Sequence, residues 1–117
     1  MSNEILVVDD NSDIRILISG ILEDTGFSVR KAANYDQAIN EINKKLPDVA
    51  IFDVKLDKGD NDGIELLTHI KKIDSEVPVI MISGHANVQM AVDSLKLGAF
   101  EFLQKPFSTE RLLNFVK

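Results

Sequence analysis

The sequence predicts an α/β fold in which an open parallel β-sheet is covered by helices on both faces. First, the apolar pattern switches repeatedly between short continuous runs and helical spacing, which is typical of βα units. Second, five such units fit into 117 residues, whereas a closed eight-unit barrel needs about twice that length. Third, right-handed crossovers wind alternating units into an open sheet. We therefore expect one compact domain over residues 1–117.

The predicted strands are five short segments rich in Val, Ile or Phe. They are residues 5–8, 27–31, 49–52, 79–82 and 100–103. Helical patterns separate them, as parallel strands require, because each connection must cross back over the sheet.

The first two predicted helices have one apolar stripe each. The stripe of the first follows i, i+3, i+4, i+7 and i+8 spacing, and Gly26 marks the end of this helix. Asn34 opens the second helix, which stops before Pro47. The residues expected to face the sheet are Ile14, Leu17, Ile18, Ile21 and Leu22 in the first helix and Ala38, Ile39 and Ile42 in the second.

The other three helices are predicted from caps as well as from apolar spacing. Asp62 is expected to cap the third and forms a capping-box pattern with Glu65. The fourth covers residues 87–97 and ends at Gly98, and the fifth follows Ser108 as N-cap. The expected inward residues are Ile64, Leu67 and Ile70 in the third helix and Val88, Ala91, Val92 and Leu95 in the fourth.

The composition excludes several classes of protein. The chain is 44% hydrophobic and 27% charged, as in soluble globular proteins, and its longest apolar runs are far too short for a membrane span. The net charge of −6 argues against gripping nucleic acid by its phosphates. The chain has no cysteine, which rules out disulfides, and its two histidines are too far apart in sequence for a zinc motif. We expect a cytoplasmic domain, without membrane or nucleic-acid contact, whose partner is a protein or a cation.

Polar side chains follow four of the predicted strands. Asp9 and Asp10 follow the first strand, Asp53 the third, Ser83 the fourth and Lys105 the fifth. Because ligands of open α/β sheets bind at the carboxyl ends of the strands, we expect these groups to converge. Each Asp or Ser alone could simply cap the next helix, and a Lys is commonly just solvated. Capping explains neither a doubled Asp nor a Lys beside a Pro.

The three carboxylates indicate a metal site. Within about 4 to 5 Å of one another they would repel by several kcal/mol at an effective dielectric near 20, so a cation must offset them. Oxygen ligands without nearby His or Cys favour Mg²⁺ over zinc or copper. One carboxylate could then attack a phosphorus atom while Lys105 and Ser83 hold the phosphoryl oxygens. Asp53 is the best nucleophile, because Asp9 and Asp10 form a pair suited to the metal.

A set of residues spread over essentially the whole chain resembles the receiver domain of bacterial two-component response regulators. In order, they are Asp9, Asp10, Asp53, Ser83, Phe102, Lys105 and Pro106. The stretch SGHANVQMAVDSLKLGAFEFLQKPF, residues 83–107, is most similar to the nitrogen-regulation (NtrC/NtrX-like) class. The resemblance implies a flavodoxin-like (βα)5 fold with strand order 2-1-3-4-5. In that class the receiver precedes an ATPase domain and a DNA-binding domain, so we expect the N-terminal part of a longer transcriptional regulator.

The resemblance also implies a chemistry for the acidic residues. Asp53 would be phosphorylated by the phosphohistidine of a sensor histidine kinase. Mg²⁺ would be held by Asp10, Asp53 and the backbone carbonyl of Lys55, with Asp9 helping through water. The domain would then catalyse only its own phosphorylation and dephosphorylation and would not otherwise be an enzyme.

The remaining implied roles concern signalling. Ser83 and Phe102 would act as switch residues, and the surface of the fourth helix, fifth strand and fifth helix would change partners or form a homodimer. Lys55 and His85 match two positions that border the phosphoryl group and could influence its lifetime. The peptide bond before Pro106 is expected to be cis.

The loop after Asp53 departs from the family pattern. Asp57 replaces the usual Pro after the phosphorylation site, and the loop to Asp62 is longer.

There are three rival functions. A haloacid dehalogenase phosphatase needs a second Asp where Lys55 stands. A flavodoxin-like cofactor binder needs a phosphate-cradling loop, but residues 9–13, DDNSD, are acidic. The remaining alternative is a receiver-like interaction module that is not phosphorylated.

Overall fold

Five strands alternate with five helices in the computed structural model, which describes residues 3–56, 59, 62–84 and 88–116. The order is β1 (Glu4–Val8), α1 (Ser12–Asp24), β2 (Ser28–Ala32), α2 (Tyr35–Lys44), β3 (Val49–Asp53), α3 (Asp62–Ile73), β4 (Val79–Ser83), α4 (Val88–Lys96), β5 (Glu101–Gln104) and α5 (Thr109–Val116). All neighbouring strands pair in parallel, in the order β2-β1-β3-β4-β5. The expected open sheet and its strand order are confirmed.

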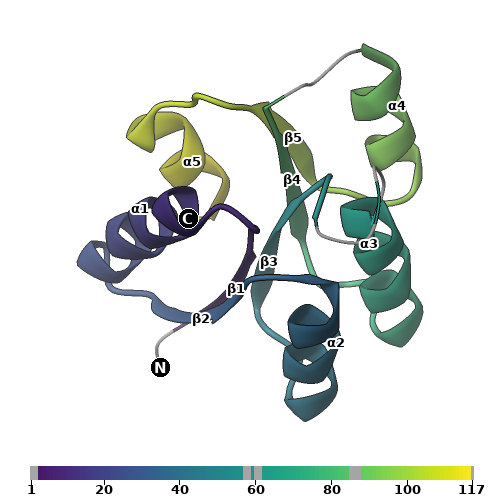
Figure 1. Ribbon diagram of the computed structural model, residues 1–117, viewed down its shortest axis with the longest axis horizontal. Helices are drawn as coiled ribbons and strands as arrows, with labels where there is room; N and C mark the ends of the chain where they lie inside the picture. Colours follow the sequence, from purple (N-terminus) through teal and green to yellow (C-terminus); the bar gives the residue numbers. More distant parts are fainter. Residues whose placement is uncertain (1–2, 57–58, 60–61, 85–87, 117) are drawn as a thin grey trace.

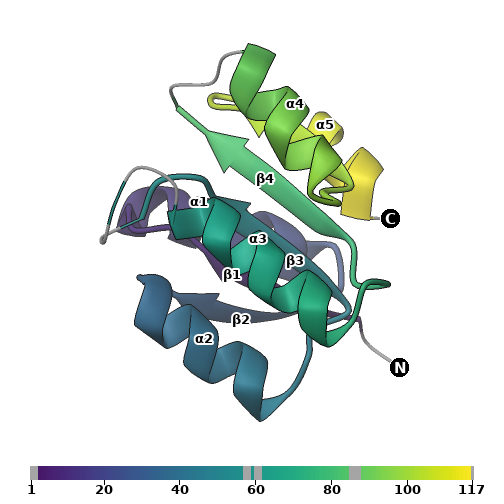
Figure 2. The same ribbon diagram turned by 90° about the vertical axis from the view of Figure 1, so that its right-hand side faces the viewer.

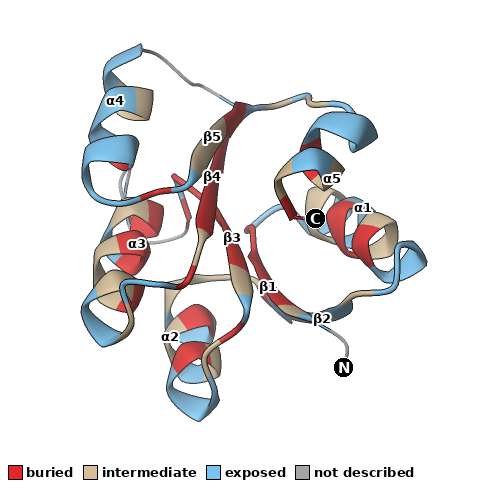
Figure 3. Ribbon diagram, turned by 180° about the vertical axis from the view of Figure 1, so that it is seen from behind, coloured by how far each residue is buried: buried red, intermediate tan, exposed pale blue. Residues whose placement is uncertain are grey.

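The helices form one layer on each face of the sheet (Figures 1 and 2). α1 and α5 cover one face, and α2, α3 and α4 lie on the other. Burial is concentrated in the strands and on the helix sides that face them (Figure 3). Within the described ranges, every helix is too short or too polar to cross a membrane. The buried apolar residues that the helices contribute are Ile18, Leu22, Leu112 and Val116 on one face and Ala38, Ile42, Leu66, Leu67 and Ile70 on the other.

Most of the predicted helix ends lie where the sequence placed them. The Asn34 side chain caps α2 by accepting a hydrogen bond from the Gln37 amide, and the Ser108 hydroxyl accepts one from the amide of Arg111 at the start of α5. Gly26 has a φ angle of 105°, a conformation that residues with a side chain rarely adopt. As a glycine it can form the turn that follows α1 at low cost.

Two apolar stripes differ from the prediction. Leu17 is 60% exposed, because α1 turns only part of its stripe toward the sheet. In α4 most of the stripe faces outward: Val88 is 81% exposed and Val92 and Leu95 are exposed too, whereas Ser94 is fully buried. Ser94 can occupy this position because its hydroxyl donates to the Met90 carbonyl at 2.9 Å. The exposed apolar residues of α4 therefore lie on the molecular surface.

Two other expectations concern the loops around the sheet edge. Asp62 is the first residue of α3 and not the residue before it, and its side chain reaches back to the loop that precedes the helix. The predicted start of the fourth helix at position 87, together with Asp57 and His85, lies outside the described residues.

Candidate functional site

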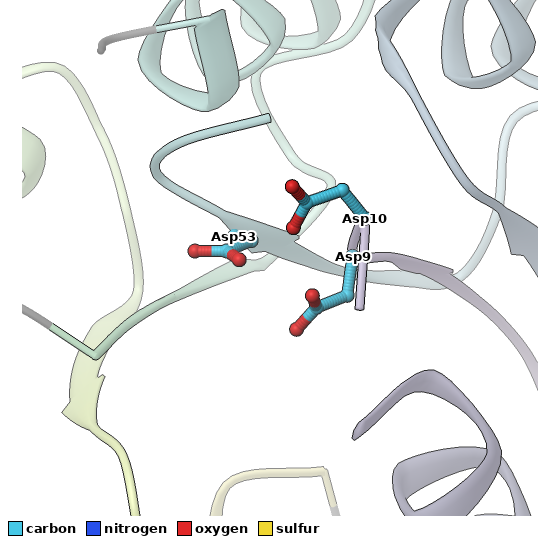
Figure 4. A group of neighbouring side chains, drawn as sticks. All are labelled: Asp9, Asp10 and Asp53. Atoms are coloured by element: carbon cyan, nitrogen blue, oxygen red, sulfur yellow. The ribbon is translucent and has the colours of Figure 1, made fainter. Parts of the chain in front are cut away.

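The carboxyl ends of β1 and β3 bring three acids together (Figure 4). Asp9 and Asp10 directly follow β1, and Asp53 is the last residue of β3, the strand that pairs with it. One carboxylate oxygen from each of the three lies within 4.8 Å of the others. Asp9 is fully buried and Asp53 is 6% exposed, whereas Asp10 is open to solvent. The predicted acidic cluster is therefore a real feature of the fold.

Lys105, which follows β5, bridges the two buried acids. Its Nζ atom donates to Oδ2 of Asp9 at 2.9 Å and to Oδ2 of Asp53 at 3.1 Å. The other oxygen of Asp9, Oδ1, accepts the Asn11 amide at 2.9 Å. Both oxygens of Asp9 are thus committed to hydrogen bonds, and this carboxylate is held in a fixed orientation.

The cluster carries more negative charge than Lys105 offsets. Burial, followed by the charge of Asp9, raises the pKa of Asp53 to about 6, although the charge and hydrogen bond of Lys105 oppose this. Burial by itself would lower the pKa of Lys105. Hydrogen bonding and attraction from Asp9 and Asp53 outweigh that effect, and the pKa lies above its ordinary value. The site therefore favours the arrival of a further cation or proton.

Ser83 and Phe102 lie beside this cluster on β4 and β5. Ser83 is buried at the end of β4, the neighbour of β3, and its carbonyl accepts the Lys105 amide at 2.9 Å. Phe102 is half-buried and packs against the core on the α2 and α3 side of the sheet. The Lys105–Pro106 peptide bond is cis, as expected. Ser83 and Lys105 are thus tied together at the sheet edge through their backbones.

The chain after Asp53 is fixed on the first turn of α3. The Gly63 amide donates to the Val54 carbonyl at 2.8 Å, and the Asp62 carboxylate accepts the Leu56 amide. Lys55 lies between these two attachments, with its side chain exposed.

Sequence reasoning missed a second cation near the cluster. Arg15, in the first turns of α1, donates through Nη1 to the backbone carbonyl of Asp9 at 2.7 Å. The signal was a basic residue six positions after Asp9, at the start of the next helix. Asn11, which caps α1 by accepting the amides of Asp13 and Ile14, was also missed.

The donor atoms of the cluster suit a hard metal ion. Asp9, Asp10 and Asp53 offer only carboxylate oxygens, which Mg²⁺ and Ca²⁺ prefer over nitrogen or sulfur ligands. Burial and the charge of Asp9 raise the pKa of Asp53, so a cation near this carboxylate would favour its charged form. The cluster can therefore hold a metal ion.

Comparison with known proteins gives one family over nearly the whole chain. Residues 5–117 match the family described as the response regulator receiver domain. The nitrogen assimilation regulatory protein NtrX of Azorhizobium caulinodans is 47% identical over 113 residues, which are 97% of this chain and 25% of that protein. The chain spans about a quarter of the length of the curated NtrX and NtrX-like relatives that it matches.

Solved structures agree with this match. The receiver domain of NtrX from Brucella abortus has a TM-score of 0.88 at 45% identity, and the alignment covers 96% of this chain and 93% of that one. A response regulator from Burkholderia pseudomallei, solved with a phosphorylated aspartic acid, a calcium ion and citrate, has a TM-score of 0.89 at 27% identity. That alignment covers 99% of this chain and 67% of the other.

Proposed function

This chain belongs to the response regulator receiver domain family, and we propose that it takes a phosphoryl group from a sensor histidine kinase onto Asp53. Receivers are signalling domains that partner such kinases. The observation that carries the proposal is the grouping of Asp53 with Asp9, Asp10 and Lys105 at the carboxyl edge of the sheet. The similar Burkholderia pseudomallei regulator, which contains a phosphorylated aspartic acid, supports the assignment to an aspartate.

Asp10, Asp53 and the Lys55 carbonyl are the proposed Mg²⁺ ligands. Asp10 is exposed and can reach an ion directly, whereas both oxygens of Asp9 already accept hydrogen bonds, which suits contact through water. When bound, Mg²⁺ would neutralise the carboxylates and the phosphoryl oxygens that approach them.

In the proposed transfer, a carboxylate oxygen of Asp53 attacks the phosphorus atom of phosphohistidine. The new P–O bond forms as the P–N bond breaks, and the imidazole leaves with the electron pair and takes a proton from solvent. Lys105 can donate to the new phosphoryl oxygens, because its Nζ is already within hydrogen-bond distance of Asp53. Asp9 holds the other side of that ammonium group and keeps it at the site.

The phosphoryl group would be read out by Ser83 and Phe102. New acceptor oxygens on Asp53 would attract the Ser83 hydroxyl from the neighbouring strand, and Phe102 on the next strand would repack. The affected surface is formed by α4, β5 and α5. Its exposed apolar residues include Val88 and, directly before β5, Phe100, whose ring lies edge-on to that of Phe115 in α5 with the ring centroids 6.3 Å apart. We propose this surface as the contact to a transcriptional output domain or to a second receiver.

Binding of beryllofluoride, a stable phosphoryl mimic, tests the proposal. Amide chemical shifts are followed while beryllium and fluoride are added to the wild-type chain and to Asp53→Asn, with and without Mg²⁺. We expect Mg²⁺-dependent shifts at Ser83 and along β5 in the wild type and none in the variant. If the wild type shows no shifts, the unphosphorylated interaction module replaces this proposal.

A further inference from the structure

The first turn of α3 lies directly against the backbone of the phosphorylation residue. A Cβ atom added at Gly63 would overlap the carbonyl oxygen of Asp53, so the approach is possible only for glycine. The same residue donates its amide to the Val54 carbonyl at 2.8 Å. α3 therefore fixes the backbone on the near side of Lys55.

Asp62 fixes the backbone on the far side of Lys55. Its carboxylate accepts the Leu56 amide across six positions of sequence, and Asp62 is only 3% exposed. A capping carboxylate lies on the residue before the helix and accepts amides of the first turn, whereas Asp62 is itself the first residue of α3. Asp62 instead commits at least one oxygen to the preceding loop, which points to a role beyond helix capping.

The amide of Leu56 and the carbonyl of Lys55 belong to the same planar peptide unit. This unit is trans, because the cis bond among the described residues is the one before Pro106. In a trans unit the N–H and C=O bonds point in opposite directions. When Asp62 holds the Leu56 amide, the Lys55 carbonyl must face away from α3 and cannot turn onto the helix.

We propose that Asp62 is a positioning residue for the Lys55 carbonyl, the backbone ligand assigned above to Mg²⁺. This inference rests on the proposed function and adds a residue to it. The hydrogen bond fixes the orientation of the carbonyl, and a negative acceptor on the N–H side polarises the peptide and makes its oxygen a stronger ligand. Gly63 supports the same arrangement by holding the Val54 carbonyl.

The test compares Mg²⁺ affinity in the wild type, Asp62→Ala, Asp62→Asn and a matched control, Glu65→Ala. Glu65 is an exposed acid of the same helix turn, so its loss changes the net charge equally without touching the loop. We expect Asp62→Ala to weaken Mg²⁺ binding by about 10-fold or more, as loss of a ligand-orienting group does. Asp62→Asn should bind more tightly than Asp62→Ala, because its amide oxygen can still accept the Leu56 amide. Glu65→Ala should match the wild type.

Several results would overturn the inference. Equal affinity of Asp62→Ala and the wild type would do so, as would equal weakening by Asp62→Ala, Asp62→Asn and Glu65→Ala, which would indicate a charge effect alone. If Asp62→Ala does not fold, Mg²⁺ is titrated into the wild type instead. The inference then requires that the NMR chemical shifts of the Lys55 carbonyl carbon and the Leu56 amide nitrogen change with one common affinity. Failure of the wild type to bind Mg²⁺ at all would overturn the proposed function as well.

Discussion

Lys105 Nζ lies 3.1 Å from Oδ2 of Asp53 and shares its charge with a second acid, Asp9, at 2.9 Å. One ammonium group thus serves two buried carboxylates, and the exposed Asp10 adds a third negative charge beside them. Arg15 is also near but donates to the backbone carbonyl of Asp9, so two cations stand against three acids. The metal-free site is therefore electrostatically strained, and a bound cation should relieve that strain.

Replacing Asp53, the proposed phosphorylation residue, should stabilise the metal-free protein. Asp53→Asn removes a buried charge whose pKa is raised to about 6, and we expect a gain of about 1 to 3 kcal/mol at pH 7. This corresponds to an increase in Tm on the order of 5 °C or more. Thermal unfolding in EDTA measures it, with Glu76→Gln, an exposed acid of the α3–β4 loop, as control. A lower Tm for Asp53→Asn would contradict the strained site.

The pH dependence of that gain has a definite sign. The folded-state pKa of Asp53, about 6, lies above its ordinary value of 3.8, so the folded protein binds this proton more tightly than the unfolded chain. The stabilising effect of protonation is complete below pH 3.8 and is lost as pH rises through about 6. The difference between wild type and Asp53→Asn should therefore be small near pH 4 and largest at pH 7. Chemical denaturation across this range would contradict the account if the difference grew on acidification.

Removing the shared cation should make the protein depend on metal. We expect Lys105→Ala to lower the free energy of unfolding without metal by about 2 kcal/mol, because Asp9 and Asp53 lose their common partner. Mg²⁺ should then raise the Tm of this variant by more than it raises that of the wild type. The exposed Lys72→Ala provides the control for a lost positive charge. Equal increases in wild type and Lys105→Ala would argue against the shared role.

The two adjacent acids should respond differently to substitution. Asp10 is exposed, so Asp10→Asn should weaken Mg²⁺ binding while leaving the metal-free Tm within a few degrees of the wild type. Asp9 is fully buried and accepts hydrogen bonds from Asn11 and Lys105, so Asp9→Asn should lower the metal-free stability by about 1 to 3 kcal/mol. Metal titration and thermal unfolding of both variants separate the two roles. Equal changes in Mg²⁺ affinity and in metal-free stability for Asp9→Asn and Asp10→Asn would contradict the separate roles of the two acids.

Two glycines of the helices should give opposite results when changed to alanine. Gly20 of α1 has nothing within 4 Å of a new Cβ, so Gly20→Ala should stabilise the protein by about 0.5 to 1 kcal/mol. At Gly63 a Cβ would overlap the Asp53 carbonyl, so Gly63→Ala should destabilise by on the order of 2 to 3 kcal/mol. Urea unfolding of the two variants measures both. A stabilising Gly63→Ala would mean that α3 does not lie against Asp53 as described.

The strands and much of the site could be predicted because their signals are local, whereas the strand order was an implication of the family resemblance. Short apolar runs mark β1 and β3, and the carboxyl ends of parallel strands necessarily meet at one edge, which brings Asp9, Asp10 and Asp53 together. Caps such as Asn34 act within one helical turn and can be predicted from the sequence for the same reason.

Contacts that depend on the path of a loop or on the rotation of a helix could not be predicted. The bond from the Leu56 amide to Asp62 spans the lengthened loop, whose course no residue pattern specifies. The apolar stripe of α4 was expected to face inward, but a small residue with an internally satisfied hydroxyl, Ser94, occupies the buried position. When the apolar face of a helix is narrow, apolar spacing shows which residues share that face but does not fix how the helix is rotated about its axis.

The most direct test of the central claim is the intact mass of the chain after incubation with acetyl phosphate and Mg²⁺. Samples of Asp53→Asn and of wild type in EDTA are measured beside it. The account predicts a phosphoryl adduct on the wild type that depends on metal and is absent from Asp53→Asn. An equal adduct on Asp53→Asn, or no adduct on a wild type that also fails to bind beryllofluoride, would contradict phosphorylation at Asp53.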